Sequence, residues 1–189
     1  MSKTKDSAPS HWPQGLRHLT EQSYHHSVPT ELQSFLRPKS SASVISVDDS
    51  RSLVLIRPIK DAVHPAYGQY GLFAARKIPP KSHILDYLGE IHCDDRPDSD
   101  YDLSLYRSQD GISVGVDASQ MGNEGRFIND FRGVRPRPNA MFEERRTSVG
   151  ELCMSVWCGT KPINKGDEIL VSYGKSWWKE RTSNGGLET

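Results

Sequence analysis

The chain of 189 residues carries 24 lysines and arginines against 24 aspartates and glutamates, so its formal net charge is zero. Because this balance creates no overall field toward nucleic acid or an anionic membrane, we expect neither as a direct partner. Three cysteines form an odd, sparse set, which favours a reducing compartment over a disulfide framework and lacks the ligands for a structural zinc. No apolar run resembles a signal peptide or a membrane span, so we expect an intracellular protein, nuclear or cytoplasmic, without a bound metal.

The first quarter of the chain is polar and only weakly patterned. Residues 1–27 are rich in serine and histidine and show no hydrophobic period, which predicts a flexible tail. Residues 28–51 are expected to form a short lead-in to the main domain. There, residues 30–33 have the form of a capping box followed by an apolar face, which predicts a helix that Pro38 ends. A brief strand is predicted over residues 44–47.

Residues 52–178 consist of short apolar runs separated by glycine and proline turns, whereas residues 179–189 form a polar tail. Strands are predicted over residues 53–56, 72–75, 84–87, 114–117, 139–142, 152–158 and 168–173. Because these runs do not alternate with long helices, we expect a mostly β domain of small sheets and not a doubly wound dinucleotide fold. The aspartate-rich segment 94–102 is either a solvated loop or a surface that attracts a basic peptide.

The segment 122–139 is the part of the chain on which the functional interpretation depends. It combines polar turns with a short apolar pair, Phe127 and Ile128, and is too irregular for a long helix. Asn129 follows that pair directly, so its amide is anchored from behind and can donate and accept hydrogen bonds toward a ligand. On its own, the segment is more typical of a surface loop rich in turn-forming residues than of a binding site.

Four short motifs around this segment stand in an order that resembles the SET-domain protein lysine methyltransferases. Gln-Tyr-Gly-Leu-Phe-Ala at 69–74 resembles the family's Gly-x-Gly turn, and Asp-Tyr-Leu-Gly-Glu at 86–90 resembles its Tyr-x-Gly strand end. Val-Asp-Ala at 116–118 with Gly-Asn-Glu-Gly-Arg-Phe-Ile-Asn at 122–129 resembles the lead-in to the family's Asn-His-Ser signature. Residues 166–174 resemble the last strand, which carries the catalytic tyrosine. Each motif alone is weak, but their common order is specific.

The resemblance implies a mostly β, SET-type β-clip fold of small curved sheets with short helices. Its last segment would thread beneath the loop that contains Asn129 and form a C-terminal pseudoknot, a topology that periodicity alone never suggests. The resemblance also implies S-adenosyl-L-methionine as methyl donor. The second substrate would be a protein or peptide, possibly a histone tail, whose target lysine enters a narrow channel from the opposite side.

Individual roles follow from the same resemblance. Tyr173 would be catalytic, with its hydroxyl facing the transferring methyl group, and Tyr87 would line the lysine channel. Asn129 would hold the methionine end of the donor. The rest of the donor site is expected to include Gln69, Tyr70, Gly71, Arg126, Phe127, Asp130 and Trp178. For Arg126 and Phe127 the alternative is packing of the knot, and for Trp178 it is a plug in the core.

The chain departs from the family pattern at two places, the glycine turn and the Asn-His-Ser signature, where Phe131-Arg132 replace Ser-Cys. Gln69 stands at the first glycine of Gly-x-Gly, and Asp130 stands at the histidine of Asn-His-Ser, with an insertion over 133–137 following it. These departures leave open a second hypothesis, a non-catalytic SET module that binds a peptide or protein partner. An active enzyme would act on a histone or on another protein, such as a ribosomal or translation factor. Val171, two residues before Tyr173, leaves the number of methyl groups added open.

Overall fold

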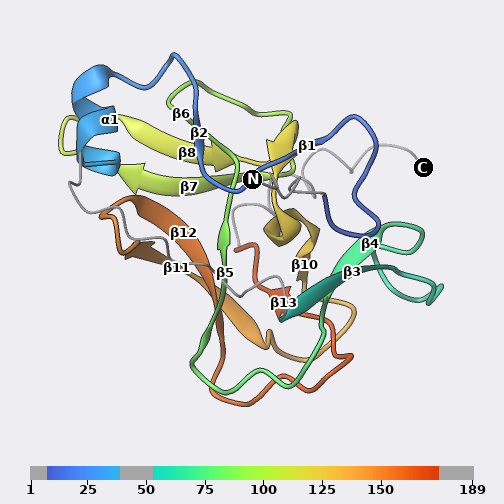
Figure 1. The fold of residues 1–189 in the computed structure, drawn as a ribbon. Coiled ribbons are helices and arrows are strands. Elements are labelled where there is room, and N and C mark those ends of the chain that lie inside the picture. Colours follow the sequence, from blue (N-terminus) through green and yellow to red (C-terminus); the bar gives the residue numbers. More distant parts are fainter. Residues whose placement is uncertain (1–7, 39–52, 175–189) are drawn as a thin grey trace, which may run out of the picture.

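Small sheets of short strands account for most of the regular structure in the computed structural model, which describes residues 8–38 and 53–174 (Figure 1). In this part of the chain no sheet has more than four strands. The expectation of a mostly β fold is therefore confirmed. Residues 44–47 and Trp178, for which a strand and a role in the donor site are predicted, lie outside the described residues.

The largest sheet has the strand order β2-β6-β8-β7 and lies at the top of Figure 1 beside helix α1. Its strands are β2 (Ser23–Tyr24), β6 (Glu90–His92), β7 (Asp102–Arg107) and β8 (Ser113–Asp117). Strand β8 is central and buried over most of its length, whereas β7 forms an edge. Ile91, Leu105 and Val116 pack there with Leu36 of α1 into one of two hydrophobic clusters. Burial of these side chains explains why the sheet and the helix form together.

A three-stranded antiparallel sheet lies below it, with the order β11-β12-β5. Its strands are β5 (His83–Tyr87), β11 (Ala140–Arg146) and β12 (Leu152–Cys158). The central strand β12 is buried almost throughout, which explains its near-continuous apolar sequence. Met154 pairs with Tyr87, so this sheet sets the position of the strand end that carries Tyr87.

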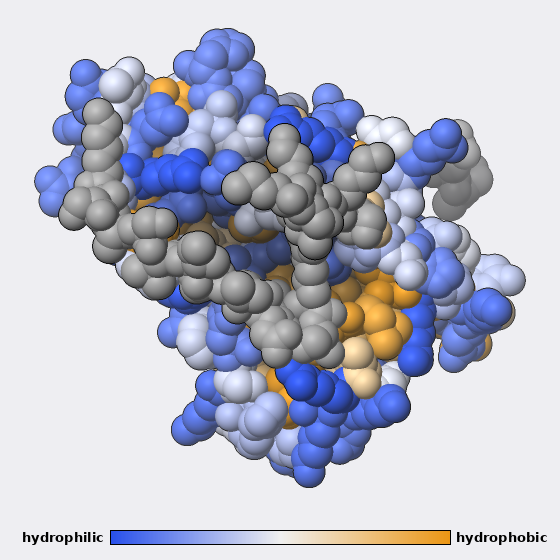
Figure 2. Space-filling view, in the orientation of Figure 1, coloured by the Kyte–Doolittle hydropathy of each residue, from blue (hydrophilic) through white to orange (hydrophobic). Residues whose placement is uncertain are grey.

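The hairpin of β3 (Val54–Pro58) and β4 (Tyr70–Ala74) forms the right-hand side of the molecule in Figure 1. Its apolar side chains, including Ile56 and Leu72, join the second hydrophobic cluster with Phe127 and Val171. Figure 2 shows a largely hydrophilic face in the same view, with hydrophobic side chains exposed chiefly in the region of β3. The hairpin thus packs one face against the segments that carry the predicted site.

Residues 8–27 are not a flexible tail, which corrects the prediction for this part of the chain. Strand β1 (Arg17–His18) pairs in parallel with β9 (Met121–Gly122), and β2 pairs in parallel with β6. Leu19 and Gln22 are buried, with 6% and 5% of their surface exposed. The segment is ordered because it pairs its backbone with two distant strands, a long-range effect that a polar sequence without a period does not reveal.

The predicted short helix is confirmed as α1 (Thr30–Leu36), but the predicted capping box is wrong. Pro29 occupies the N-cap position, and no side chain caps the helix. The fixed φ of proline starts the helix without a side-chain acceptor. Leu36 is fully buried and anchors the helix on the large sheet.

The last strand passes between the two ends of the 130–139 loop, as the predicted pseudoknot requires. On one side, β10 (Asn129–Asp130) pairs in parallel with β13 (Leu170–Val171). On the other side, the main-chain N–H of Asn139 donates to the Leu170 carbonyl at 3.1 Å, and the Asn139 Oδ1 accepts from the Leu170 N–H at 2.8 Å. A 3-10 helix, η2 (Glu124–Phe127), leads into β10. This threading brings residue 173 into hydrogen-bond contact with residues 128 and 130.

Candidate active site

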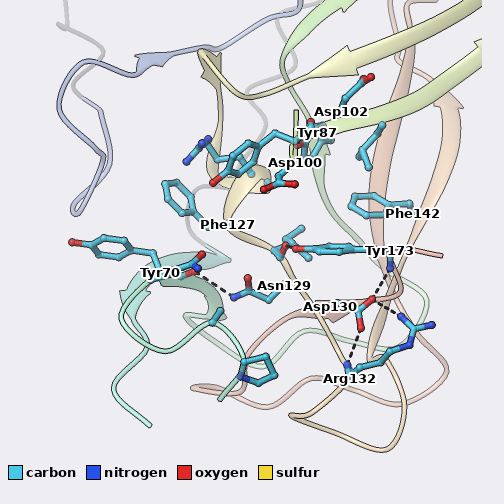
Figure 3. Close-up of a pocket in the computed structure, with 18 of the residues that line it drawn as sticks. Tyr70, Tyr87, Asp100, Asp102, Phe127, Asn129, Asp130, Arg132, Phe142 and Tyr173 are labelled. Atoms are coloured by element: carbon cyan, nitrogen blue, oxygen red, sulfur yellow. Dashed lines mark hydrogen bonds and ion pairs between the residues drawn. The ribbon is translucent and has the colours of Figure 1, made fainter. Parts of the chain in front are cut away.

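One pocket of about 830 Å³ lies where η2, β10 and the end of the chain's last strand meet the β3–β4 loop (Figure 3). The predicted site residues on its wall are Gln69, Tyr70, Tyr87, Arg126, Phe127, Asn129, Asp130 and Tyr173. Gly71 is buried behind the wall and is not among the lining residues. The structure therefore brings Asn129, Tyr87 and Tyr173 together from three separate motifs.

Tyr173 is held at both its main chain and its hydroxyl. Its N–H donates to Asp130 Oδ2 at 2.8 Å, and its hydroxyl donates to the carbonyl of Ile128 at 2.6 Å. Burial, and then the negative charge of Asp130, raise the pKa of the Tyr173 phenol well above its ordinary value. The side chain is therefore a neutral phenol whose proton points at a carbonyl.

Tyr87 is a second neutral phenol on the same wall. Only 4% of its surface is exposed, and its hydroxyl donates to the Tyr101 carbonyl at 2.8 Å. Burial, and then the neighbouring Tyr173, raise the pKa of Tyr87 well above its ordinary value. Its ring meets the ring of Phe142 edge-on, with centroids 5.9 Å apart. Two hydroxyls thus line the pocket, each fixed by a main-chain acceptor.

The turn after Tyr87 is fixed by two buried side-chain amides. Gln22 donates from Nε2 to the Tyr87 carbonyl and accepts the Gly89 N–H on Oε1, both at 2.9 Å. Asn123 accepts the Leu88 N–H at 3.1 Å. Gln22 could not be found from the sequence, because nothing in the local pattern of residues 8–27 signals a partner 65 positions away. Asn123 lies within the Gly-Asn motif, which was the available signal.

The orientation of the Asn129 amide follows from its neighbours. Its Nδ2 lies 2.9 Å from Oε1 of Glu168 and 3.3 Å from the Tyr70 carbonyl. Both partners are acceptors, so the amide must turn its NH₂ group toward them. Within residues 8–38 and 53–174, no hydrogen bond is made to Asn129 Oδ1, and Figure 3 shows the amide nitrogen turned toward Tyr70. Asn129 therefore offers the pocket an acceptor, suited to a ligand ammonium or N–H group.

Arg126 and Phe127 both line the pocket, and both also pack against the segments around it. Arg126 Nε donates to the Ala118 carbonyl at 3.0 Å, and its guanidinium lies 4.1 Å from the centroid of the Tyr101 ring. Phe127 is 6% exposed, and its ring meets the rings of Trp12 and Tyr70 edge-on. The amino-terminal segment thus supports the pocket from behind through Trp12.

Asp130, which stands at the family's histidine position, has a clear structural role. Besides the Tyr173 N–H, its carboxylate accepts the Arg132 N–H at 2.8 Å and pairs with Arg132 Nη1 at 2.7 Å (Figure 3). The carboxylate joins the loop after β10 to the main chain of the predicted catalytic tyrosine. This departure from the family pattern therefore stabilises the knot.

The wall of the pocket also carries two carboxylates, those of Asp100 and Asp102. Asp102 Oδ1 lies 2.9 Å from Nε2 of His92. Burial disfavours protonation of His92, but its hydrogen bond to Asp102 outweighs that effect and raises the pKa of the imidazole. Carboxylates at this position favour a cationic substrate group.

In the described ranges 8–38 and 53–174, no three His, Cys, Asp or Glu side chains are grouped to hold a metal ion. No helix of that part of the chain is long and apolar enough to span a membrane.

The sequence profile of the SET domain matches residues 69–174, more than half of the chain, and these residues include the four motifs and the pocket described above. The chain belongs to the SET-domain family. A comparison with curated proteins gave no match.

Solved SET-domain structures share the fold. ATXR5 in complex with a monomethylated histone H3.1 superposes with a TM-score of 0.59 at 15% identity, covering 84% of this chain and 81% of that one. An apo form of ctPRC2 with two substitutions in Ezh2 gives a TM-score of 0.50 at 28% identity, covering 68% of this SET-domain chain and 16% of that chain. Chaetomium thermophilum polycomb repressive complex 2 bound to GSK126 gives a TM-score of 0.50 at 24% identity, covering 69% of this chain and 17% of that one. The chain thus spans about a sixth of the length of the polycomb chains.

Proposed function

We propose that this SET domain transfers a methyl group from S-adenosyl-L-methionine to a lysine side chain of a protein. The observation that carries the proposal is the meeting of Tyr87, Asn129 and Tyr173 on one pocket, although they come from three distant segments. Methyl transfer from a sulfonium to an amine is an in-line displacement that needs alignment and no covalent intermediate. A pocket whose polar groups are already fixed by main-chain partners supplies that alignment.

The residues present fit the methyl donor. A volume of about 830 Å³ lies in the range typical of pockets for ligands of this size. Asn129 Oδ1 would accept from the donor's ammonium, and the rings of Tyr70 and Phe127 would give apolar surface to its heterocycle. When bound, the donor supplies a methyl group on a positively charged sulfur.

The two tyrosines would orient the lysine amine without deprotonating it. Each phenol already donates its proton to a carbonyl, and each has a raised pKa, so neither serves as a general base. Their oxygen atoms accept from the amine N–H groups and from polarised C–H groups of the methyl. A lysine amine has an ordinary pKa of about 10.4, so it must lose its proton to solvent as it enters this buried channel, where desolvation lowers its pKa.

A histone tail is the first substrate to test, because ATXR5, whose fold this chain shares, has been solved with histone H3.1. The acidic wall at Asp100 and Asp102 supports a basic peptide of this kind. A histone substrate would place the protein in the nucleus, on chromatin. A lysine in another protein fits the same pocket chemistry.

The experiment is methyl transfer from a labelled donor to core histones and to total-lysate protein, with donor binding measured by calorimetry in parallel. In the transfer assay we expect wild type and the exposed control variant Lys165→Ala to label lysine. In calorimetry we expect Asn129→Ala to bind the donor at least about tenfold more weakly than wild type. Failure of wild type to bind the donor at about millimolar concentration would overturn the proposal and favour the non-catalytic binding module. Donor binding without transfer to any lysine would do the same.

A further inference from the structure

His64 and Glu168 form a buried pair beside the pocket, and neither has a role in the function proposed above, although Glu168 lies within the 166–174 motif. His64 lies in the loop between β3 and β4, and Glu168 lies just before β13, 104 positions later. Both side chains are only 8% exposed, and His64 Nε2 lies 3.0 Å from Glu168 Oε2. A buried polar pair of this kind is costly unless its hydrogen bonds are satisfied, which calls for an account of what the pair does.

The hydrogen bonds fix the direction of the pair. Nδ1 of His64 accepts the main-chain N–H of Ala66 at 3.0 Å, so the imidazole carries its proton on Nε2 and donates it to Glu168. The second oxygen of Glu168, Oε1, accepts from Nδ2 of Asn129 at 2.9 Å. One continuous chain of hydrogen bonds therefore runs from the β3–β4 loop through the carboxylate to the Asn129 amide.

This chain determines which atom Asn129 turns to the pocket. Asn129 donates one amide hydrogen to Glu168, and its other amide hydrogen lies beside the Tyr70 carbonyl. If the amide were flipped, its oxygen would face these two acceptors. The negative carboxylate behind the NH₂ group also polarises the amide and makes Oδ1 a stronger acceptor. Gly71 leaves the room that Glu168 needs, because a Cβ at residue 71 would lie 2.6 Å from Glu168 Oε1.

We propose that His64 and Glu168 are positioning residues that lock Asn129 with its Oδ1 toward the ammonium group of the methyl donor. This inference rests on the function proposed above. It makes discrimination in favour of a donor with an ammonium group a property of the His64–Glu168–Asn129 chain, of which His64 lies outside the segment that matches the SET domain.

The test uses S-adenosylhomocysteine and an analogue in which hydrogen replaces its amino group, with affinities measured by calorimetry on the full chain. Wild type should bind S-adenosylhomocysteine about tenfold or more tightly than the analogue. Glu168→Gln should reduce that preference to about twofold or less while binding the analogue as wild type does, because its amide presents a donor to His64 or to Asn129. His64→Phe should behave in the same way, and His64→Gln, which keeps a donor on a side chain of similar reach, should restore most of the preference. For these three variants, turnover at a saturating concentration of the methyl donor should stay within about threefold of the wild-type value.

Each outcome separates the inference from the function on which it rests. Thermal unfolding of each variant checks that the fold is kept, and Gly71→Ala gives an independent way to displace the Glu168 carboxylate. If wild type prefers S-adenosylhomocysteine and Glu168→Gln and His64→Phe keep that preference, the positioning role is wrong and the methyltransferase proposal stands. If wild type binds neither compound, the methyltransferase proposal itself fails.

Discussion

The main-chain N–H of Tyr173 donates a 2.8 Å hydrogen bond to the carboxylate of Asp130, 43 positions earlier in the chain. This contact ties the loop after β10 to the residue that follows β13, and so it closes the knot at the pocket. The residue at the family's histidine position thus holds the main chain of the proposed catalytic tyrosine. Asp130 is only 8% exposed, so the bond is shielded from solvent.

Replacement of Asp130 should loosen the knot. Asp130→Ala leaves the N–H groups of Tyr173 and Arg132 without their acceptor, and we expect it to lower the free energy of unfolding by about 2 to 4 kcal/mol. Arg132→Ala is the matched control. It removes the partly exposed ion pair but keeps both N–H bonds, and it should cost less than about 1 kcal/mol. Urea unfolding measures both values, and equal costs for the two variants would argue against the tether.

Removal of the Tyr173 hydroxyl should separate catalysis from binding. Tyr173→Phe keeps the ring and loses the hydrogen bond to Ile128, so we expect a stability loss of about 1 kcal/mol. Turnover should fall by about 100-fold, while the donor dissociation constant stays within about twofold, because the hydroxyl would act on the reacting groups. Steady-state kinetics and calorimetry give the two numbers. Turnover close to wild type would remove Tyr173 from the chemistry.

The pH dependence of turnover should report the substrate amine and not the tyrosines. Burial raises the pKa of Tyr173 and of Tyr87 above the ordinary value of about 10, so both phenols stay protonated in any usual assay. We expect the rate to rise with pH as more lysine becomes neutral, without a falling limb below about pH 10. A falling limb between about pH 8 and 10 that coincides with a tyrosinate absorbance signal would contradict the environment described for the two phenols.

The stability of the fold should depend on pH through the ionisation of Asp86. Burial alone would raise the pKa of its carboxyl, but hydrogen bonds from His83, Arg145 and Ser155 outweigh burial and hold that pKa well below its usual range. A depressed folded-state pKa stabilises the protein above the unfolded value of about 3.9, and the contribution is lost as pH falls through the folded value.

Asp86→Asn should therefore be less stable than wild type by about 3 kcal/mol at neutral pH, and the difference should shrink below about pH 4. Urea unfolding at a series of pH values measures it. The exposed Asp110→Asn is the control and should follow wild type throughout. A constant difference across that range would mean that the ionised form of Asp86 is not what stabilises the sheet.

The amino-terminal segment should be needed for the pocket. Gln22→Leu leaves the Tyr87 carbonyl and the Gly89 N–H without partners, so we expect a loss of about 2 to 4 kcal/mol and reduced turnover. Gln22→Glu keeps an acceptor for Gly89 and should lie between Gln22→Leu and wild type. Gln14→Leu, at an exposed position of the same segment, should change neither quantity. Wild-type stability for Gln22→Leu would mean that the segment merely rests on the domain.

Local pattern predicted the elements that are long and buried. The strand expected over residues 152–158 has those bounds in the structure, because a near-continuous apolar run at the centre of a sheet is a strong signal. The strand expected over residues 168–173 is shorter, Leu170–Val171, since its ends bond to loops and to side chains. Strand β7 went unpredicted, because its first residue belongs to the aspartate-rich segment that was interpreted as a loop or a peptide-binding surface.

For the site, the order of motifs predicted which residues would meet, but not what holds them. Asn129 and Tyr173 share a pocket as expected, because the family pattern carries the knotted topology. Gln22, which holds the turn after Tyr87, could not be predicted as a support, and neither could His64 and Glu168, which hold Asn129. Each acts through a partner 39 or more positions away, and no local spacing encodes such a contact.

The most direct test is a crystal structure of the protein with S-adenosylhomocysteine and a lysine peptide. We predict that the ligand's amino group lies within hydrogen-bond distance of Asn129 Oδ1. We also predict that the lysine amine reaches the hydroxyls of Tyr87 and Tyr173 from the side of Asp100. Density for either molecule outside this pocket, or a lysine side chain that does not reach Tyr173, would contradict these predictions.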